Sequence, residues 1–203
     1  MGLLTKINVG YGLYILSAKE NNKENACIIN TFLQVTSGVS PSCVITVSKE
    51  NLTHSMVMNT NIFNLSVLAA EATFDIFERF GYQTGRNVDK FSGYESHIQR
   101  SKNGLIYTTQ NTNAFMSFVV MGTMDFETHT MFTAQPVESK VLSEVESVTY
   151  NYYQKHIKPK PRSMKAAGYR CIICNYVYEG ENLPLDYICP ICKHGVNEFV
   201  IAI

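Results

Sequence analysis

Short apolar segments rich in β-branched residues recur along most of the chain, and polar segments separate them. Residues 26–30, 42–48, 114–121 and 128–141 each have the length and composition of a β-strand. Few helical patterns lie between them. Strands at this density predict a mainly β protein, built around an antiparallel barrel.

Three segments predict short helices. Asn51 is a suitable N-cap for a helix over about residues 52–58. Aromatic residues at helical spacing predict a second helix over residues 73–80, and Gly81 stands where such a helix stops. A last helix, over about residues 147–155, is expected to close the domain.

The composition changes after residue 157. Residues 158–167 open with a basic run that contains two prolines, which neither continues a helix nor joins a sheet easily. We therefore expect a β domain over residues 1–157, a linker over residues 158–167, and a small separate module over residues 168–203.

Charge and hydropathy narrow the possible partners. Seventeen basic residues balance 17 acidic ones, so the charge gives no reason to expect nucleic acid or an anionic membrane. No apolar run is long enough to span a bilayer, and residues 1–14 lack the pattern of a secretory signal. We expect a cytoplasmic protein whose thiols are reduced.

Four of the six cysteines lie in the last 33 residues, as Cys171, Cys174, Cys189 and Cys192. Each Cys-x-x-Cys pair can fold into a tight turn, and two such turns facing each other place four sulfurs in a tetrahedron. This spacing predicts a metal site, and by itself it leaves zinc and iron open. Because a module this short buries little core, its folding should depend on the metal.

The turn around each cysteine pair favours a residue with positive φ just after the second cysteine. Asn175 tolerates that conformation after Cys174, whereas Lys193 does so less well after Cys192. Gly195 comes two residues too late to help. We expect the second turn to be slightly altered.

The other cysteines and the histidines show no metal pattern. Cys27 and Cys43 stand alone in apolar strands, which predicts buried and unreactive thiols. The five histidines are scattered. No Gly-x-Gly-x-x-Gly follows a predicted strand, so we expect no separate nicotinamide-binding domain.

Residues 169–203 resemble a rubredoxin. The shared features are the aromatic residue before the first cysteine, the Tyr176-Val-Tyr178 segment and the Cys189-Pro-Ile-Cys192 turn. Only 14 residues separate Cys174 from Cys189, a spacing nearer the rubredoxin-like tail of rubrerythrins. The resemblance implies an iron that carries one electron. The short loop keeps zinc open, since short four-cysteine ribbons often hold it.

The preceding domain resembles the flavin reductase family, which has a split-barrel fold. The resemblance implies bound FMN and a homodimer whose flavin lies near the subunit interface. The segments that carry it, in order, are Asn25–Thr31, Gln34–Thr36, Val47–Thr53, Phe80-Gly81, Thr84–Phe91, His129–Phe132 and Tyr150–Tyr153.

A bound FMN needs a neutralised phosphate and hydrogen bonds along the polar edge of its ring. Lys49, Asn51 and Thr53 lie at a predicted helix start, where free amides attract an anion, although a solvated helix entry explains them equally well without the resemblance. Asn30, Thr31 and Thr36 could instead make ordinary hydrogen bonds at the end of a strand. Lys90 and His129 could instead be surface or structural residues. The expected flavin site comprises Asn30, Thr31, Gln34, Val35, Thr36, Ser48, Lys49, Asn51, Thr53, Lys90 and His129.

The pairing of the two modules predicts a function. NAD(P)H would pass a hydride to FMN without a protein acid or base, so we expect no catalytic residue. Reduced FMN releases electrons singly, and a single iron accepts one at a time. This arrangement resembles the high-molecular-weight rubredoxins of anaerobes, whose rubredoxin part reduces a flavodiiron protein.

Two alternatives stay open at the level of sequence. One is a free flavin reductase that supplies reduced FMN to another enzyme and carries a structural zinc ribbon. The other is a flavin-binding module that only stores or senses redox state.

Overall fold

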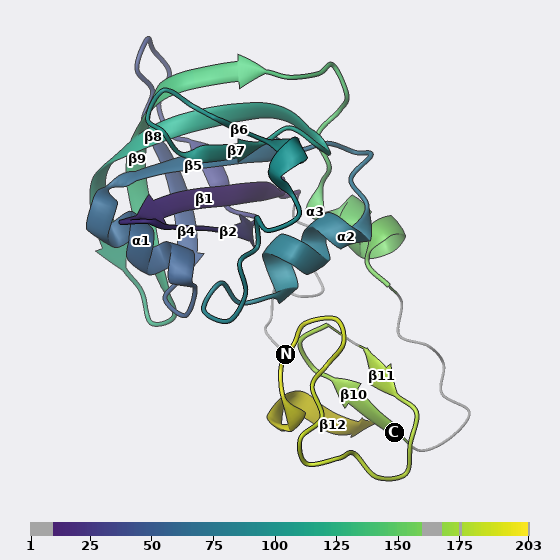
Figure 1. The fold of residues 1–203 in the computed structure, drawn as a ribbon. Coiled ribbons are helices and arrows are strands. Elements are labelled where there is room, and N and C mark those ends of the chain that lie inside the picture. Colours follow the sequence, from purple (N-terminus) through teal and green to yellow (C-terminus); the bar gives the residue numbers. More distant parts are fainter. Residues whose placement is uncertain (1–9, 160–167, 175, 203) are drawn as a thin grey trace.

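Seven antiparallel strands form one curled sheet, which makes up the larger part of the molecule (Figure 1). The structure is a computed structural model, and it describes residues 10–159, 168–174 and 176–202. The strand order is β2-β1-β5-β8-β9-β4-β3, so segments distant in sequence lie side by side. This confirms the predicted mainly β architecture. The strands are β1 (Tyr14–Glu20), β2 (Lys23–Ile29), β3 (Phe32–Gln34), β4 (Cys43–Ser48), β5 (Ile62–Leu68), β8 (Thr112–Asp125) and β9 (His129–Val141).

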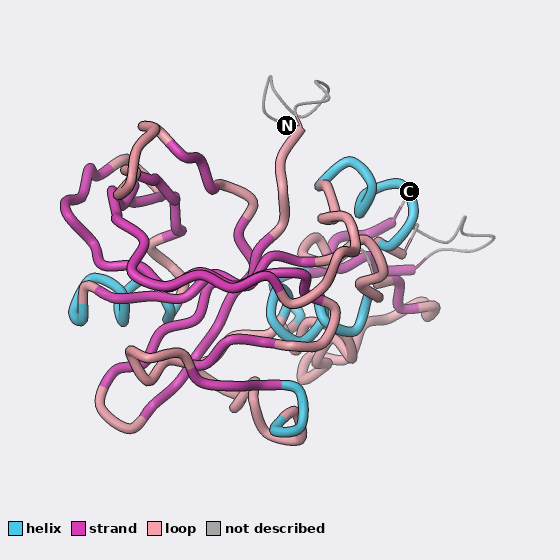
Figure 2. The backbone as a smooth tube through the Cα atoms, turned by 90° about the horizontal axis from the view of Figure 1, so that it is seen from above, coloured by secondary structure: helices cyan, strands magenta, loops and turns pink. Residues whose placement is uncertain are grey.

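The long hairpin of β8 and β9 dominates the sheet. Its register shifts between Ser117 and Phe118 and again between Val120 and Gly122. Such bulges bend a strand and increase its twist, which lets an open sheet curl toward a barrel. Figure 2 shows the strands turning around the domain rather than lying flat.

The inside of the curled sheet is filled by aromatic and aliphatic side chains. Phe63 of β5 stacks on Phe118 of β8 with 4.9 Å between ring centroids, and Phe132 of β9 is fully buried. Helix α1 (Leu52–Thr60) adds Met56 and Val57 to the same core. The helix begins after Asn51 as predicted and ends at Asn61, whose left-handed φ of 58° lets its amide bond the Val57 carbonyl.

A second core lies under two helical segments and the small pair β6 (Ile98–Arg100) and β7 (Ile106–Thr108). The first segment is α2 (Phe74–Phe77), continued by a π-helical stretch, Glu78–Tyr82. The prediction that Gly81 stops this helix is wrong. Gly81 lies inside the π-helical stretch, where a Cβ would come 3.2 Å from a side-chain carbon of Ile28.

The last helical segment starts later than predicted. It is α3 (Tyr150–Tyr152), followed by a π-helical stretch, Tyr153–Ile157. Ser147 instead bridges Ala69 as an extended residue, and the Thr149 side chain accepts a hydrogen bond from the Tyr152 amide. The cap therefore decides where this helix begins.

The C-terminal module is a separate three-stranded sheet in the order β11-β10-β12. Its strands are β10 (Gly168–Cys171), β11 (Val177–Tyr178) and β12 (Phe199–Ala202). Tyr187 packs edge-on against Tyr178 and Phe199. Most of the expected linker, residues 160–167, lies outside the described residues, so the linker stays a prediction.

Short 3-10 turns, Glu95–His97 and Val196–Glu198, complete the described secondary structure. Among the residues that the structure describes, no helix combines the length and apolarity that crossing a bilayer requires.

Candidate functional site

A pocket of about 210 Å³ opens where β2, β4 and β9 meet the start of α1 and α3. Four of the expected flavin residues lie in its wall, namely Asn30, Ser48, Asn51 and His129. Aliphatic and aromatic side chains form the rest of the wall, with polar groups on the other side. Such a wall suits a flat ring with one polar edge. The pocket is lined by Leu13, Ile28, Ile29, Asn30, Thr46, Ser48, Asn51, His129 and Tyr150.

The start of α1 faces this pocket through Asn51. The Asn51 side chain makes no capping bond to the helix, and the first turn carries no acidic residue. The helix start can therefore direct its amides and its positive dipole end at an anion. This is the chemistry that a phosphate group requires.

Two cations lie near the helix start, and their partners differ. Lys49 forms an ion pair with Asp125, with 3.5 Å between Nζ and Oδ1. Arg86 reaches over the turn before the helix, where Nη2 donates to the Glu50 carbonyl at 3.5 Å. Arg86 has no acidic partner among the ion pairs of the described residues. The uncompensated charge beside the helix start is thus Arg86, which the sequence analysis did not select.

His129 lies at the pocket edge beside a hydrogen-bonded chain. Its Nδ1 is 2.8 Å from the Thr128 hydroxyl. Next to it, Thr130 donates to Asp125 at 2.7 Å and meets His54 Nε2 at 2.8 Å. The Thr130 hydrogen bond lowers the pKa of Asp125, whereas burial lowers the pKa of His54. This wall is therefore polar yet internally satisfied.

Seven of the eleven expected residues lie outside the pocket wall, and four of these seven follow one another closely around β3. The Thr31 hydroxyl donates to Asn30 Oδ1 at 3.3 Å and so helps to orient a pocket residue. Gln34 donates to the Thr36 carbonyl, and the Thr36 hydroxyl accepts from the Ser42 amide, which ties the β3–β4 loop to itself. Val35 is exposed on the same loop. The chain by itself does not bring Gln34, Val35 and Thr36 to the pocket.

The side chains of Thr53 and Lys90 are buried and do not line this pocket, so their role as flavin contacts stays a prediction. Thr53 is fully buried and accepts a hydrogen bond from Asn25 Nδ2 at 2.9 Å. Lys90 is 3% exposed, and its Nζ donates to the carbonyls of Ala26 at 2.8 Å and Phe80 at 3.0 Å. Burial lowers the pKa of Lys90 to about 8. Both side chains hold the barrel together rather than line the pocket.

Sequence reasoning also missed pocket residues. Tyr150 belongs to a segment that carried the family resemblance, and that segment was the available signal for it. Leu13 and Thr46 carried no signal, because an apolar or threonine side chain in a strand looks the same whether it faces a core or a pocket.

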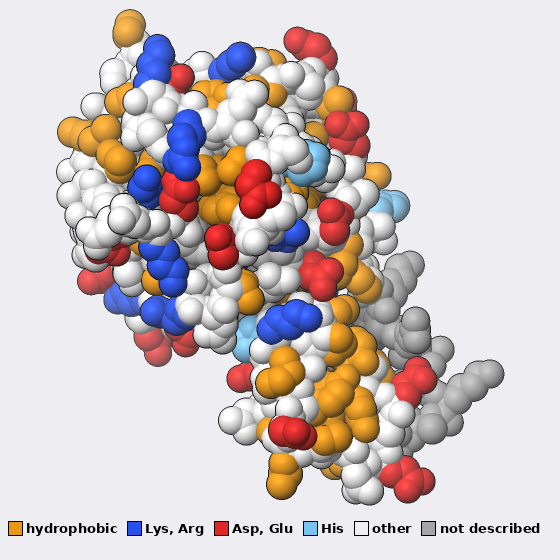
Figure 3. Space-filling model, in the orientation of Figure 1, with side chains coloured by type: hydrophobic (Ala, Val, Ile, Leu, Met, Phe, Trp, Pro, Cys, Tyr) orange, Lys and Arg blue, Asp and Glu red, His pale blue; other side chains and the backbone are white. Residues whose placement is uncertain are grey.

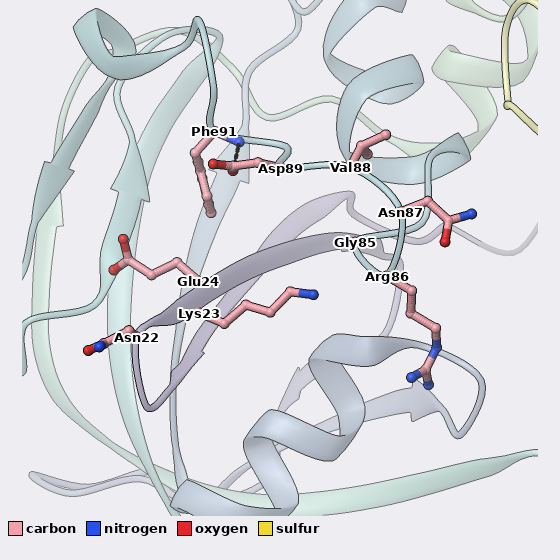
Figure 4. Close-up of a pocket in the computed structure, with 9 residues that line it drawn as sticks. All are labelled: Asn22, Lys23, Glu24, Gly85, Arg86, Asn87, Val88, Asp89 and Phe91. Atoms are coloured by element: carbon pink, nitrogen blue, oxygen red, sulfur yellow. Dashed lines mark hydrogen bonds between the residues drawn. The ribbon is translucent and has the colours of Figure 1, made fainter.

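A second hollow, of about 420 Å³, lies between the β1–β2 turn and the loop of residues 84–91 (Figure 4). In Figure 4, Lys23 extends into the space beside this loop, and Arg86 extends toward α1. Two carboxylates share the wall, so its charge is mixed. The hollow is lined by Asn22, Lys23, Glu24, Gly85, Arg86, Asn87, Val88, Asp89 and Phe91.

The four C-terminal cysteines form a buried cluster whose sulfurs all lie within 4.8 Å of one another. The Sγ atoms of Cys171 and Cys192 are 3.5 Å apart, and those of Cys174 and Cys189 are 3.4 Å apart. A tetrahedral ion bound about 2.3 Å from each sulfur requires sulfur–sulfur edges of about 3.8 Å. The cluster therefore fits a single tetrahedral metal ion after small adjustments.

Backbone groups surround these sulfurs. The backbone of Tyr176 hydrogen-bonds the Cys174 sulfur, and the backbone of His194 bonds the Cys192 sulfur. Hydrogen bonding between the two side chains lowers the pKa of Cys174 and raises the pKa of Cys192. Hydrogen bonds to sulfur favour the thiolate, which is the form that binds metal.

The second cysteine turn keeps its positive φ despite its side chain. Lys193 has a φ of 61°, and its amide donates to the Cys189 carbonyl at 3.0 Å. The prediction that this turn is altered is therefore wrong for the backbone, because Lys193 adopts the positive φ that the turn favours. The Lys193 ammonium donates to the Pro190 carbonyl at 2.6 Å, which helps to hold the conformation. Asn175, the matching residue of the first turn, lies outside the described residues.

Cys27 and Cys43 are free, buried and remote from the cluster. Burial raises the pKa of both thiols, so they stay protonated and unreactive. The prediction that they are buried is confirmed, and their lack of reactivity stays a prediction.

Comparison with protein families matches both parts of the chain. Residues 7–160 match the flavin reductase like domain, and residues 169–200 match the rubrerythrin, rubredoxin-like domain. The molecule thus combines an FMN-binding flavin reductase fold with a rubredoxin-like four-cysteine site for iron, and it is a flavoprotein oxidoreductase. The chain belongs to the flavin reductase-like family. The match to the rubrerythrin-type domain agrees with the short spacing between the cysteine pairs.

Two relatives share about a third of the sequence. A high molecular weight rubredoxin of Moorella thermoacetica is 33% identical, and the match covers 93% of this chain and 94% of the relative. A ferric-chelate reductase (NAD(P)H) of Archaeoglobus fulgidus is 32% identical over 78% of this chain and 91% of the relative.

Solved structures share the barrel fold at low sequence identity. An FMN-binding protein from Thermus thermophilus gives a TM-score of 0.60 at 17% identity, covering 70% of this chain and 78% of that one. An NADH:FAD oxidoreductase from Streptomyces globisporus gives 0.61 at 17% identity, with 70% and 82% covered. Flavoredoxin from Methanosarcina acetivorans gives 0.60 at 15% identity, with 71% and 75% covered.

Proposed function

We propose that this protein oxidises NAD(P)H through FMN and passes single electrons to its own four-cysteine iron, and from there to a redox protein. The observation that carries the proposal is the presence, in one chain, of a flavin reductase-like pocket and a buried tetrathiolate site. The relative named as a high molecular weight rubredoxin matches 93% of this chain, and the one named as an NAD(P)H reductase supports the electron donor.

The pocket residues divide into two roles in this proposal. Arg86 and the start of α1 hold the phosphate, with Lys49 and Asn51 beside them. Asn30, Ser48 and His129 hydrogen-bond the polar edge of the ring, while Leu13, Ile28 and Tyr150 pack against its apolar part. When bound, the flavin supplies the hydride chemistry, and the protein supplies orientation and electrostatics.

Iron is the metal that the neighbouring domain can use. Zinc has no redox chemistry in proteins, so electrons from the flavin would find no acceptor there. A tetrathiolate iron accepts one electron at a time, and hydrogen bonds to the sulfurs tune its potential. The backbone bonds to Cys174 and Cys192 serve this role.

The module offers a surface on which an acceptor protein can dock. Figure 3 shows apolar side chains gathered on the visible face of the module. Ile172, Ile173 and Ile188 are exposed and lie next to cysteine ligands in the sequence. An apolar rim around a redox centre suits a transient protein partner, and a flavodiiron protein is the partner that we propose.

A homodimer is part of the proposal. The pocket of about 210 Å³ is smaller than the roughly 300–1,000 Å³ of typical cofactor sites, which supports its completion by a second surface. Exposed apolar residues on the β8–β9 hairpin, among them Met121, Met124 and Phe126, offer such a surface. We place the protein in the cytoplasm, because its six cysteines are free thiols.

A second function has one observation in its favour. The match to the Archaeoglobus relative covers 91% of that protein but only 78% of this chain. A protein named as a reductase therefore matches this chain without a part as long as the whole of it. In that case the chain is a free flavin reductase and the cysteine site is a zinc ribbon. Metal content separates the two functions.

The decisive experiment is an anaerobic visible spectrum of the purified full-length protein, recorded before and after NADH or NADPH, together with metal analysis. The proposal predicts flavin and ferric-thiolate bands that both bleach. Flavin bleaching with zinc in the cysteine site establishes the free flavin reductase instead. Flavin that neither nucleotide reduces contradicts both and leaves a binding or sensing role.

The variant Cys189→Ser tests whether the two centres are separable. It removes one of four thiolate ligands, so the iron bands should disappear while flavin reduction by NADH continues. Cys43→Ser is the matched control, because Cys43 is a buried free thiol outside the cluster. Loss of flavin reduction in Cys189→Ser but not in Cys43→Ser contradicts separable centres.

A further inference from the structure

Tyr82 connects the barrel to the cysteine cluster. It ends the π-helical stretch after α2 and packs directly against the four cysteines. The other residues packed there, Tyr176, Ile191 and Phe199, belong to the module itself. Within the described residues, Tyr82 is therefore the barrel's contribution to the shell of the metal site. Figure 1 shows the module on the side of the barrel where α2 and α3 lie.

Tyr82 continues into the barrel through a second tyrosine. Its hydroxyl is 2.6 Å from the hydroxyl of Tyr153, which is only 5% exposed. Tyr153 also packs on Phe77, with 4.3 Å between ring centroids. Burial raises the pKa of both tyrosines, so their hydroxyls stay protonated and the hydrogen bond persists at ordinary pH.

Tyr150, which lies one helical turn before Tyr153, connects this pair of tyrosines to the pocket. The rings of Tyr150 and Tyr153 lie 6.2 Å apart, centroid to centroid, and Tyr150 lines the pocket. A continuous packed route thus runs from the pocket wall through Tyr150, Tyr153 and Tyr82 to the sulfurs. It consists of side-chain contacts and one hydrogen bond.

Charge complementarity supports the same contact. The Lys158 amide donates to the Tyr153 carbonyl at 2.8 Å, and its half-buried side chain lies close enough to Cys174 for their charges to interact. Four thiolates around one iron carry a net negative charge in either oxidation state. The negative charge of Cys174 attracts this lysine, while burial, which is the larger effect, lowers the pKa of Lys158.

We propose that Tyr82 and Tyr153 form the electron-transfer contact through which the cysteine module receives electrons from the flavin pocket of its own chain. The inference rests on the proposed function. In this step one electron leaves the reduced flavin and one Fe³⁺ becomes Fe²⁺, while the proton that the flavin loses goes to solvent. The tyrosines serve only as a packed medium, so neither is oxidised and each keeps its hydroxyl proton.

The kinetic test uses the full-length protein with FMN and iron under anaerobic conditions. After mixing with NADH, the flavin and iron bands are followed separately in wild type, Tyr82→Phe and Tyr153→Phe. Each variant removes the hydroxyl bond but keeps the ring. We expect unchanged flavin bleaching and severalfold slower iron bleaching in both.

The matched control is Tyr107→Phe. Tyr107 is also buried, and its hydroxyl donates to Gln99 Oε1 at 2.6 Å, but it lies on β7 away from this route. Iron bleaching in this variant should match wild type. Equal iron bleaching in wild type, Tyr82→Phe and Tyr153→Phe overturns the inference. If wild type bleaches only its flavin, the proposed function itself fails.

A second measurement reports docking without any electron transfer. Small-angle X-ray scattering of the full-length, zinc-loaded protein should give a larger radius of gyration for Tyr82→Ala than for wild type, Tyr82→Phe or Tyr107→Phe. The alanine removes the ring that meets the cysteine cluster. An unchanged radius of gyration in Tyr82→Ala overturns the docking role of Tyr82, whatever the kinetic result.

Discussion

The function of Lys90 could not be inferred from its residue type alone, because it depends on the groups around the side chain. A lysine in a segment shared with flavin proteins suggests a cofactor contact, yet this ammonium lies inside the barrel between two backbone carbonyls. A buried donor that satisfies two carbonyls is costly to remove. Lys90 is therefore expected to act on stability, and on flavin binding only indirectly.

The variant Lys90→Met should lower the free energy of unfolding by about 2 kcal/mol, because the carbonyls of Ala26 and Phe80 lose their donor. Urea unfolding measures it. Lys140→Met, which changes an exposed lysine of β9, is the control and should have little effect. A stability equal to wild type contradicts the structural role.

Lys90 also makes a pH prediction. Burial lowers its folded pKa to about 8 from 10.5, so between these values the unfolded chain binds a proton that the folded chain does not. The free energy of unfolding therefore rises as the pH increases from about 8 to 10.5. Below about pH 8 the buried lysine is charged, and the full cost of removing that charge from water lowers the stability. Wild type should show this rise relative to Lys90→Met in urea unfolding across the same range.

Among the elements, the start of α1 shows what tertiary packing adds to a local motif. The sequence identified the helix and its N-cap, and it selected Lys49 as the cation for a phosphate. In the fold, Asp125 from β8 already pairs with Lys49, whereas the loop of residues 84–91 brings Arg86 over the same turn. The cation that we propose for the phosphate thus comes from a distant segment of the chain.

Arg86→Gln should weaken FMN binding about tenfold, which corresponds to about 1.4 kcal/mol for one lost charged contact. Lys49→Ala should weaken it less, because Asp125 offsets that charge. Titration of FMN fluorescence with the flavin-free protein measures both. Lys102→Gln, an exposed charge change elsewhere, controls for net charge. If Lys49→Ala costs more than Arg86→Gln, the assignment of the phosphate cation is wrong.

The whole molecule presents apolar side chains that a single chain leaves in water. Met121 is 62% exposed and Met124 is 55% exposed, and both lie on the part of β8 that pairs only with β9. Apolar residues clustered in this way mark an interface. Together with the small pocket, these residues are the observations that support the proposed dimer.

Sedimentation velocity should therefore give a wild-type mass of about twice 22.9 kDa. The double variant Met121→Glu, Met124→Glu should sediment as one chain and bind FMN more weakly, because charges in an apolar interface oppose association. Leu185→Glu, at an exposed leucine of the module, should stay dimeric. A wild-type protein that sediments as a single chain excludes the dimer.

The sequence by itself determined the features that depend on near neighbours. Segments rich in β-branched residues identified β2, β4, β8 and β9, because strand preference follows from local side-chain packing, whereas β1 and β5 were not predicted. Helix α1 begins directly after Asn51, as the sequence predicted, although the Asn51 side chain makes no capping bond. The cysteine spacing predicted one buried four-sulfur site, since two short turns can place their sulfurs in only a few ways.

Only the tertiary structure decided which side chains meet. The fold buries Thr53 and Lys90, brings Tyr150 to the wall of the pocket, and places Arg86 over the turn before α1. It also places Tyr82 against cysteines about 90 to 110 residues further along the chain. Such contacts depend on strand order and on the docking of two modules, and residues so far apart leave no periodic trace in the sequence.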